Sequence, residues 1–578
     1  MVGGKTHWKI AVLFIVSMFV VFSGRGYAGT THPTVSADTQ IYIVGGGLAG
    51  LTAAATAIQD ANIPGKNIHI LEKRKVAGGA CDSTGGTRNK PYFARGARLY
   101  DPTAFRAFRK FLAKIPSYDD QKEMEKLGNN SGYKAKKTLD DEFAEFSATH
   151  KIDSITRLVG KDQQRINHLD YGLSMRDRYD LFKLVRSSEE STYGKRIDEY
   201  FQPAFFQTSL WYQWSSIFGF MPYHGLTEMQ RYSRTFFHIL PNLKTLHDTA
   251  WVTPYNTYQS VIEPTVMWLK TQGVNFHMGC KVTDVDFKPS LDEKTIQRIY
   301  YTDNGTPKTI EVRNNDFVLI TNGSKVADTP DSGVGDMKNP PKLERGKVDG
   351  SWTLWEKMAT KQPGLGNPNA FTTSIDHSKI QLVSITTSTA LFGDMVLKFS
   401  KNKVMGEQHE MIFVDSPWQI VFHQTWHPFV KNQDPNTTIF MLMALKHAPG
   451  DYVKKKMEDC TGEEILQELC YQLGFMKEMP EILRTSVVMS QNEPYVSSQF
   501  LLRNKYDRPP VVPDRSTNLA FIGEFAEMPD ESVFLMNYSC KTAEVAIYTL
   551  LNINKEPTPF YHGVRSPWNW IRAVISVM

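Results

Sequence analysis

The sequence has little of what marks several large classes of protein. Its five cysteines are widely separated and form no CxxC pair, so neither a disulfide framework nor a zinc site is indicated, and we expect no bound metal. The formal net charge of +5 is small for 578 residues and lysine and arginine form no dense block, so we expect no nucleic-acid partner. Internal repeats and long low-complexity segments are also missing. The composition is that of an ordinary globular protein, long enough for two or three domains.

The apolar run near the N-terminus is short. It extends from Ile10 to Phe22, follows the basic residues Lys5 and Lys9, and precedes small residues that end at Ala28. This order is typical of a secretory signal peptide, whereas a membrane span needs about 20 apolar residues. We therefore expect residues 1–28 to direct export, giving a periplasmic or secreted protein. An uncleaved N-terminal anchor is the alternative.

A dinucleotide-binding pattern is present near residue 45. The apolar stretch 41–44 leads into Gly45-x-Gly47-x-x-Gly50, and an alanine-rich stretch typical of a tightly packed helix follows. The three glycines permit a tight turn, close approach of the backbone to a pyrophosphate, and close packing of the helix on the strand. A second apolar stretch ends at Glu72, whose carboxylate can accept hydrogen bonds from a ribose. Together these features predict a Rossmann-like nucleotide site, with the phosphates at the helix N-terminus.

Features further along the chain favour FAD over NAD. Directly after Glu72 comes KRKVAGGACDSTGG and then RGAR, an order that resembles the large flavoprotein family in which a second glycine stretch and an arginine continue the FAD site. The stretch around Val282 is similar to the strand whose backbone reaches the adenine in such proteins. Residues 518–527 and the helix-like stretch after them put a glycine turn and a helix N-terminus where they can meet the flavin. We therefore expect FAD as the cofactor.

Several unusual segments carry a closer resemblance. They are SLWYQWSSIFGFMPYHGLTEMQRYSRTFFHILPNL (209–243), TPYNTYQSVIEP (253–264), DYVKKKMEDCTGEEILQELCYQLG (451–474) and PYVSSQFLLRNKYDRPPVVP (494–513). With GGGLAG, GGACD and RGAR they resemble the oleate hydratases, also called myosin-cross-reactive antigens, over nearly the whole chain after residue 38. The resemblance implies an FAD-dependent enzyme that adds water across a cis double bond of an unsaturated fatty acid, giving a hydroxy fatty acid with no net redox change.

We expect an α/β fold: a discontinuous Rossmann-like FAD-binding domain with a mixed α/β substrate domain and helical additions. The expected divisions are an FAD-binding domain from 38–135, 265–330 and 510–555, a helical substrate-site segment at 136–264, a substrate domain at 331–509 and a C-terminal segment at 556–578. Apolar residues around Arg572 in the last segment suit a helix at a bilayer surface. Packing on a second subunit is the alternative, and we expect a homodimer.

The resemblance also implies particular site residues. Those expected to contact FAD are Gly45, Gly47, Leu48, Ala49, Gly50, Glu72, Gly79, Arg95, Gly96, Val282, Ser324, Gly523 and Ser532. Those expected to bind the fatty-acid carboxylate are His423, Thr425 and His427, in a segment where the family supplies threonine, asparagine and histidine. Ordinary surface or core-edge histidines are the alternative for these positions.

The family's proton donor corresponds to Tyr232. The family pattern WHSxxExxxYxxRF reads YHGLTEMQRYSRTF here, with His224 and Glu228 preceding Tyr232 at four-residue steps on one face of a helix. A tyrosine with a pKa near 10 is protonated at neutral pH and can donate to an alkene carbon. On spacing alone, a tyrosine hydrogen-bonded at the edge of a core is the commoner explanation.

The family's water-activating glutamate is missing. Its RGGRE motif reads RGAR followed by Leu99, which cannot take a proton. Asp101 is a candidate substitute, although it also suits the N-cap of a following helix. Three readings stay open: a hydratase of altered specificity, a double-bond isomerase in which Tyr232 protonates the alkene and a neighbouring proton is lost, and a non-catalytic flavin- and lipid-binding protein. A flavin oxidase acting on amines ranks last, because it fits the nucleotide-binding pattern but not the fatty-acid motifs. Hydration is favoured because the rest of the family pattern is present.

Overall fold

The computed structural model describes residues 32–84, 91–94, 99–127, 134–152, 154–166, 171–247, 249–290, 292–329, 334–343, 350–406 and 409–577. The predicted signal peptide, residues 1–28, lies outside the described residues.

A five-stranded parallel sheet forms the nucleotide-binding part of the fold. Its order is β19-β13-β1-β2-β9, and each neighbouring pair is parallel. The strands are β1 (Ile41–Val44), β2 (Ile68–Glu72), β9 (Asn275–Met278), β13 (Phe317–Thr321) and β19 (Leu519–Ile522). β13 and β19 are almost entirely buried apolar runs, as expected for a parallel sheet covered on both faces. The strands come from three separated parts of the chain, which confirms the expected discontinuous Rossmann-like fold.

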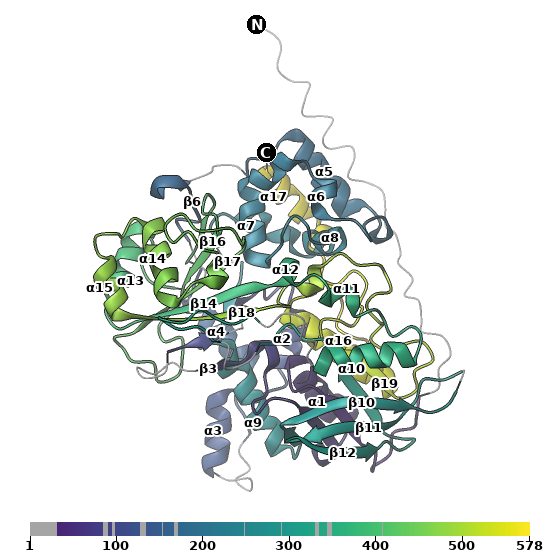
Figure 1. Ribbon diagram of the computed structural model, residues 1–578. Coiled ribbons are helices and arrows are strands. Elements are labelled where there is room, and N and C mark those ends of the chain that lie inside the picture. Colours follow the sequence, from purple (N-terminus) through teal and green to yellow (C-terminus); the bar gives the residue numbers. More distant parts are fainter. Residues whose placement is uncertain are drawn as a thin grey trace. The chain divides into compact units, whose positions relative to one another are not determined.

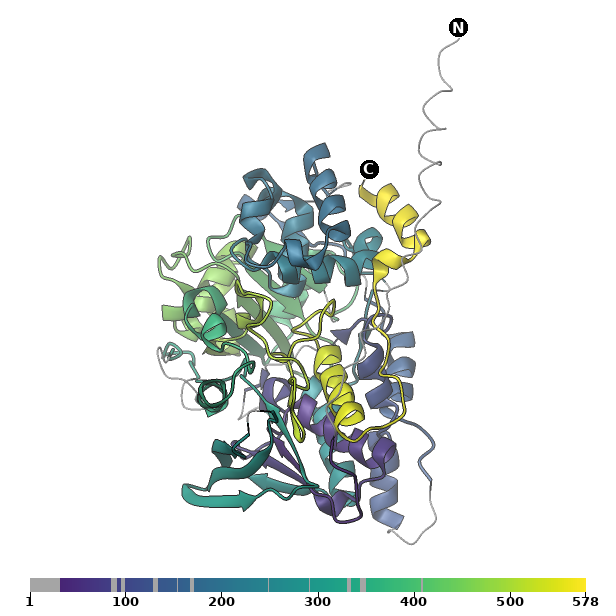
Figure 2. The same cartoon turned by 90° about the vertical axis from the view of Figure 1, so that its right-hand side faces the viewer.

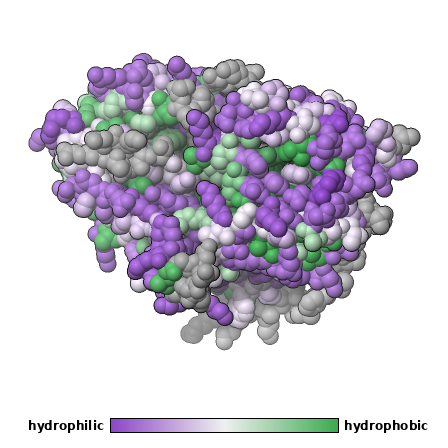
Figure 3. Space-filling view, turned by 90° about the horizontal axis from the view of Figure 1, so that it is seen from below, coloured by the Kyte–Doolittle hydropathy of each residue, from purple (hydrophilic) through white to green (hydrophobic). Residues whose placement is uncertain are grey.

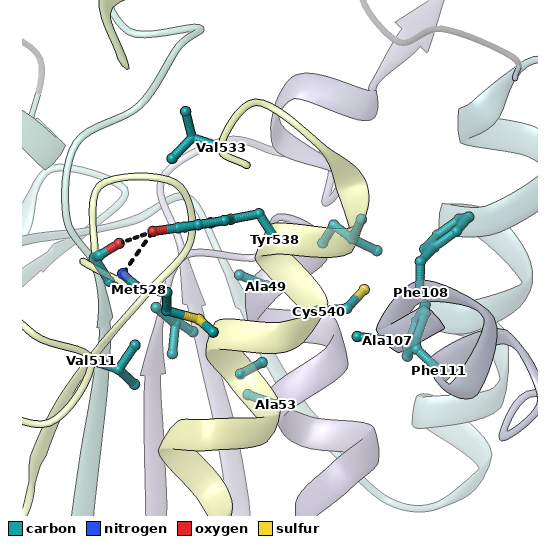
Figure 4. Packing of buried hydrophobic residues seen from close by; sticks show 14 of the residues in the cluster. Ala49, Ala53, Ala107, Phe108, Phe111, Val511, Met528, Val533, Tyr538 and Cys540 are labelled. Atoms are coloured by element: carbon teal, nitrogen blue, oxygen red, sulfur yellow. Dashed lines mark hydrogen bonds between the residues drawn. The ribbon is translucent and has the colours of Figure 1, made fainter. Parts of the chain in front are cut away.

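Helix α1 (Leu48–Ala61) packs against α16 (Met536–Leu550) through small side chains. Figure 4 shows Ala49 and Ala53 of α1 facing the part of α16 that carries Cys540. The Tyr538 hydroxyl accepts a hydrogen bond from the Met528 amide at 3.0 Å and donates one to the Ala526 carbonyl at 2.6 Å. These bonds tie the loop before α16 to the helix, so the chain leaving β19 is held over the end of the parallel sheet.

A seven-stranded sheet forms the second layered unit. Its order is β18-β14-β17-β16-β15-β6-β7, and all neighbouring pairs are antiparallel except β15 and β6. The strands are β6 (Leu158–Val159), β7 (Arg165–Ile166), β14 (Ile380–Thr387), β15 (His409–Phe413), β16 (Ile420–Gln424), β17 (Thr438–Ala444) and β18 (Ser486–Glu493). β6 and β7 come from the segment 136–264, which was expected to be helical.

Alternate residues of this sheet face opposite ways. Val383, Met411, Phe422 and Phe440 belong to a core shared with residues of α13 (Leu391–Ser400), α14 (Gly462–Leu473) and α15 (Met479–Thr485). These helices cover one face of the sheet, on the left of Figure 1. The other face is therefore left to line the space between the two sheets.

Helices from residues 175–235 lie at the top of Figure 1: α5 (Met175–Arg186), α6 (Ile197–Tyr200), α7 (Ser209–Phe218) and α8 (Leu226–Thr235). The N-cap of α7 is Thr208, whose side chain accepts a hydrogen bond from the Trp211 amide, and the C-cap is Gly219 with φ of +75°. The C-terminal helix α17 (Pro567–Val577) packs beside them, with the Trp570 ring 4.5 Å from Phe237 and 5.7 Å from Phe182 (Figure 2).

The remaining elements complete the framework. They are α2 (Arg106–Leu112), α3 (Tyr118–Leu127), α4 (Leu139–Thr149), α9 (Glu263–Thr271), α10 (Gly350–Lys361), α11 (Asn369–Thr372), α12 (Ile375–Ser378), β3 (Ser83–Thr84), β4 (Phe93–Ala94), β5 (Leu99–Tyr100), β8 (Trp251–Val252), β10 (Cys280–Phe287), β11 (Ile296–Asp303) and β12 (Thr306–Glu311). Within the described ranges, no helix combines the length and apolar character needed to cross a bilayer. All five cysteines are free thiols.

Candidate active site

One cavity of about 520 Å³ lies where the nucleotide-binding sheet, the end of α7 and the seven-stranded sheet meet. At one end it is lined by glycine-rich loops after β1 and β2 and by the segment after β19. At the other end its lining is mainly apolar. The apolar residues include Ile217, Phe218, Ile239, Leu246, Ile380, Leu382, Met441, Met443 and Val496. A cavity of this kind suits a dinucleotide at one end and an aliphatic chain at the other.

The first glycine loop presents an open helix N-terminus to the cavity. Gly45 has φ of +107°, and a Cβ on Gly50 would lie 2.1 Å from the Gly45 carbonyl oxygen, so both positions require glycine. The N-cap of α1 is Gly47, and no side chain caps the helix there. Gly47, Leu48 and Ala49 line the cavity. Backbone N–H groups at this helix end are therefore available to a phosphate.

Glu72 orders the loops around this end. One carboxylate oxygen accepts a hydrogen bond from the Gly46 amide and the other from the Arg74 amide, each at 2.7 Å. Arg74 in turn forms an ion pair with Asp82 at 2.7 Å. Glu72 also lines the cavity, so the same carboxylate holds two glycine-containing loops together and faces the space where a ribose is expected.

Most of the predicted cofactor residues meet at the cavity. Those that line it are Gly45, Gly47, Leu48, Ala49, Glu72, Gly79, Val282, Ser324 and Gly523. Gly50 instead packs α1 on β1, and the fully buried Ser532 donates from its hydroxyl to the Thr235 hydroxyl at 3.0 Å. Arg95 and Gly96 lie outside the described residues.

An ion pair in this part of the cavity was missed by the sequence reasoning. Lys325 Nζ lies 2.8 Å from Glu524 Oε1, and both residues line the cavity. Each directly follows a predicted cofactor residue, Ser324 and Gly523. That adjacency was the signal that could have identified the pair.

Asp101 lies at the cavity and has two kinds of partner. Its Oδ1 accepts hydrogen bonds from the amides of Thr103 at 2.8 Å and Ala104 at 3.1 Å, which close a turn. The helix N-cap considered from the sequence was wrong, because α2 begins only at Arg106 and its N-cap is Phe105. Its Oδ2 lies 2.7 Å from Nε2 of His238. Asp101 is therefore both a turn-capping residue and half of a carboxylate–imidazole pair. Leu99 pairs through its backbone with Val252, next to this site.

Tyr232 lies one layer behind the cavity. It is fully buried, its hydroxyl donates to the Val533 carbonyl, and its ring contacts Phe218 and Phe236, which line the cavity. Tyr232 itself is not a lining residue. Burial, helped by the charges of nearby glutamates, raises the pKa of the phenol well above its usual value, so it stays protonated.

The two residues that precede Tyr232 in the family pattern also point away from the cavity. His224 lies before α8, accepts a hydrogen bond at Nδ1 from the Met221 amide at 3.0 Å, and faces the His377 carbonyl with Nε2 at 3.0 Å. Glu228 is buried against Arg503 at 2.9 Å and Arg508 at 3.1 Å. This charge cluster extends to Arg231, Glu189 and Glu527. The cluster fixes α8 in the interior.

Of the three residues predicted to bind the carboxylate, His423 alone lines the cavity. The Thr425 hydroxyl donates to the Ile439 carbonyl at 2.6 Å and is buried elsewhere. His427 is exposed, with Nε2 3.3 Å from the Asp434 carbonyl. The strand β16 ends at Gln424, so the alternation that orients His423 does not extend to the other two. Glu410, opposite His423 on β15, was not predicted.

Comparison with known proteins identifies the family. The sequence model of the MCRA family matches residues 38–548. An oleate hydratase from Streptococcus pyogenes serotype M49 (strain NZ131) is 31% identical over 547 residues, covering 91% of this chain and 88% of that protein. A linoleate hydratase from Lactiplantibacillus plantarum is 29% identical over 562 residues, covering 90% and 95%. A fatty acid isomerase from P. acnes that produces CLA has a TM-score of 0.45 and 11% identity, covering 89% of this chain and 99% of that one.

Proposed function

The chain belongs to the MCRA family, and from this premise we propose that it is an FAD-dependent hydratase that adds water to a cis double bond of an unsaturated free fatty acid. The observation that supports the proposal most is the cavity itself. An open helix N-terminus and glycine-rich loops lie at one end, and apolar side chains suited to an acyl chain at the other.

The residues at the first end fit FAD. The uncapped N-terminus of α1 would hold the pyrophosphate, Glu72 a ribose, the backbone near Val282 the adenine, and the turn at Gly523 the flavin. Bound FAD would supply a flat, polarising surface beside the alkene. Glu72 and its two backbone partners hold the loops in place for this ligand.

Water addition needs a group that orients water near the alkene. We assign this to Asp101, whose carboxylate faces the cavity and is positioned by His238. Both ring nitrogens of His238 face acceptors, since Nδ1 lies 3.2 Å from the Thr235 carbonyl. The imidazole is thereby fixed, and it fixes Asp101 in turn. Asp101 stands two residues after Leu99, close to the position of the family's missing base.

Proton donation is assigned to Tyr232 from the family pattern. In the structure its hydroxyl donates a hydrogen bond to the Val533 carbonyl. The assignment therefore requires that the hydroxyl leave this carbonyl and donate to the substrate instead. Phe534, the next residue, lines the cavity and has φ of +67°. A shift of this segment would free the phenol from the Val533 carbonyl.

Isomerisation is the second candidate function, and the observation that favours it is Leu99. Without a carboxylate at that position, a carbocation formed by protonation can lose a neighbouring proton instead of capturing water. A non-catalytic lipid-binding protein is the third.

Product analysis separates these candidates. Purified protein with FAD is incubated with oleic or linoleic acid in deuterated water, and the products are examined by mass spectrometry. Hydration adds the mass of one water, isomerisation leaves the formula unchanged apart from exchanged deuterium, and a binding protein returns the acid untouched. Recovery of an isomer only, or of unchanged acid, would refute the hydratase proposal. Colourless protein that takes up no FAD would refute its cofactor.

We also propose that the mature protein is exported and associates with membranes peripherally. The exposed apolar residues of α17 and α5 support the second part: Trp568, Ile571, Val574, Ile575, Met175, Tyr179 and Phe182. We call these seven residues the apical patch. By contrast, hydrophilic side chains dominate the face seen in Figure 3, at the lower end of Figure 1. A homodimer interface is the alternative role for the patch.

A further inference from the structure

A polar pair interrupts the apolar end of the cavity. Glu410 on β15 and His423 on β16 are directly opposite each other in the antiparallel pairing, so their side chains lie on the same face of the sheet. Both residues line the cavity. Glu410 is only 1% exposed, which makes it an unusual acid to find beside an acyl chain.

Within the described residues, one of the two carboxylate oxygens of Glu410 accepts hydrogen bonds. Oε1 accepts hydrogen bonds from Arg157 Nη1 at 2.7 Å and from the Ser216 hydroxyl at 2.8 Å. No residue in the described part of the chain donates a hydrogen bond to Oε2, and Nδ1 of His423 lies 3.6 Å from it. This carboxylate oxygen is therefore an acceptor without a donor at the cavity end.

The charge of Glu410 is balanced by a buried cation. A further carboxylate, Glu493 of β18, lines the same cavity and is also 1% exposed. Arg157 is buried, forms an ion pair with Glu410 and does not line the cavity. Burial raises the pKa of Glu410, but Arg157 and His423 outweigh it and hold the pKa below its usual value. Burial lowers the pKa of His423, with Glu410 opposing and Arg157 reinforcing the shift. At neutral pH the cavity therefore meets an ionised carboxylate and a neutral imidazole.

A fatty-acid carboxylate placed here would lie next to the buried carboxylate of Glu410. Two such groups do not stay ionised side by side, because one of them takes up a proton. We infer that the Glu410–His423 end binds a neutral head group that donates a hydrogen bond, such as a protonated carboxyl, a primary amide or a hydroxyl on an aliphatic chain. This inference rests on the proposed function, because it assumes an acyl ligand in the cavity. It makes Glu410 a specificity-determining residue.

Two N–H groups of Arg157 would instead favour an ionised head group. Nε and Nη2 of Arg157 are buried, and neither has a hydrogen-bond partner among the described residues. A carboxylate that reached these N–H groups would be bound as an anion, and its affinity would not fall as the pH rises.

The test measures by calorimetry how tightly oleic acid, oleamide and oleyl alcohol bind to the FAD-loaded protein. The measurements are made at several values between about pH 6 and about pH 8.5. A ligand that must carry a proton loses up to about tenfold in affinity for each pH unit above its own pKa. We expect this loss for oleic acid and flat profiles for the amide and the alcohol. Oleic acid that binds equally well across the range, and tighter than oleamide at the upper end, would overturn the inference.

Two variants sharpen the test. Glu410→Gln keeps the shape and should flatten the oleic acid profile, with about tenfold or greater tightening near pH 8. His423→Gln is the matched control, and its affinity for oleic acid should still fall as the pH rises. If the affinity for oleic acid no longer depends on pH in His423→Gln but still does in Glu410→Gln, the titrating group is the imidazole, and the inference is overturned. If Glu410→Gln fails to fold, the comparison of the three ligands on the wild-type protein still decides. Binding of none of the three would overturn the proposed function along with the inference.

Discussion

At the scale of single residues, Tyr232 is the sharpest case, because its hydroxyl bonds to a backbone carbonyl behind the cavity wall. If it is the proton donor, Tyr232→Phe should lower turnover by about 10²–10⁴-fold while FAD stays bound, since the ring is kept and the phenol is lost. Tyr100→Phe is the matched control. Tyr100 lines the cavity, and within the described part of the chain its buried hydroxyl has no hydrogen-bond partner, so that variant should retain activity. Full activity of Tyr232→Phe would remove the carried-over mechanism.

Leu99 gives the second residue-scale prediction, made with Leu99→Glu. If the wild type mainly isomerises, the added base should divert product toward the hydroxy acid. If the wild type already hydrates, another group positions the water, and the added carboxylate should lower the rate, because an unpaired charge in an apolar site is unfavourable. We expect the second outcome. Asp101→Asn tests the same point from the other side: asparagine still caps the turn, so a loss of hydration without a loss of stability would identify the carboxylate as the water-orienting group.

At the scale of elements, the end of β2 and the start of α1 are held together by one side chain. Glu72 accepts hydrogen bonds from the Gly46 and Arg74 amides, so Glu72→Ala should weaken FAD retention and also lower the melting temperature by several degrees. Glu72→Gln keeps one hydrogen-bond acceptor, so its FAD retention and its melting temperature should both fall less. The flavin-to-protein absorbance ratio and a thermal scan measure the two effects. Unchanged FAD content in Glu72→Ala would place the ribose elsewhere.

The turn before α8 carries a pH-dependent contribution to stability. Burial lowers the pKa of His224 to about 4, and protonation of Nδ1 would break its hydrogen bond from the Met221 amide. Since the unfolded chain takes up this proton near pH 6.5, the stabilisation is complete above that pH and is lost as the pH falls toward about 4. In His224→Gln the melting temperature should depend less on pH between about pH 4 and pH 6.5. A wild-type curve that is already flat there would contradict the assignment.

The same elements show how far the sequence reasoning reached. Gly45, Gly50 and Glu72 were placed correctly as parts of a strand–turn–helix unit because each depends on neighbours close in sequence or on a well-defined spacing. The pairing of Glu410 with His423 was missed because it depends on the register between two strands, which local sequence does not specify. For the same reason Thr425 and His427 were predicted together with His423, although they lie beyond the end of β16.

Tyr232 illustrates a further limit. The spacing correctly put Glu228 and Tyr232 on one helix, but almost every residue of α8 is buried, so helical periodicity could not say which side faces the cavity. The layer of Phe218 and Phe236 between Tyr232 and the cavity comes from α7 and from the segment after α8. Such an arrangement follows from tertiary packing and not from the pattern of one segment.

At the scale of the whole molecule, the proposed membrane association depends on the apical patch. Trp568 is 73% exposed and Ile575 71% exposed, on a helix that contacts α5 through Trp570 and Phe182. The same two helices carry exposed basic side chains: Arg176, Lys183 and Arg186 on α5 and Arg572 on α17. Helices that expose both apolar and basic groups suit an anionic bilayer surface, where insoluble fatty acids partition.

The corresponding prediction concerns Trp568→Ala combined with Ile575→Ala. Wild-type protein should float with vesicles of phosphatidylglycerol and phosphatidylcholine, and the double variant should bind at least about tenfold more weakly, since burial of each side chain contributes about 1.5–3 kcal/mol. Tyr506→Ala is the matched control: Tyr506 is 79% exposed but lies outside the apical patch, so its loss should leave vesicle binding unchanged. Wild-type protein that ignores vesicles and elutes as a dimer, with the double variant monomeric, would assign the patch to a subunit interface instead. The two outcomes differ in what covers the same residues, so flotation and sizing of these three proteins distinguish them.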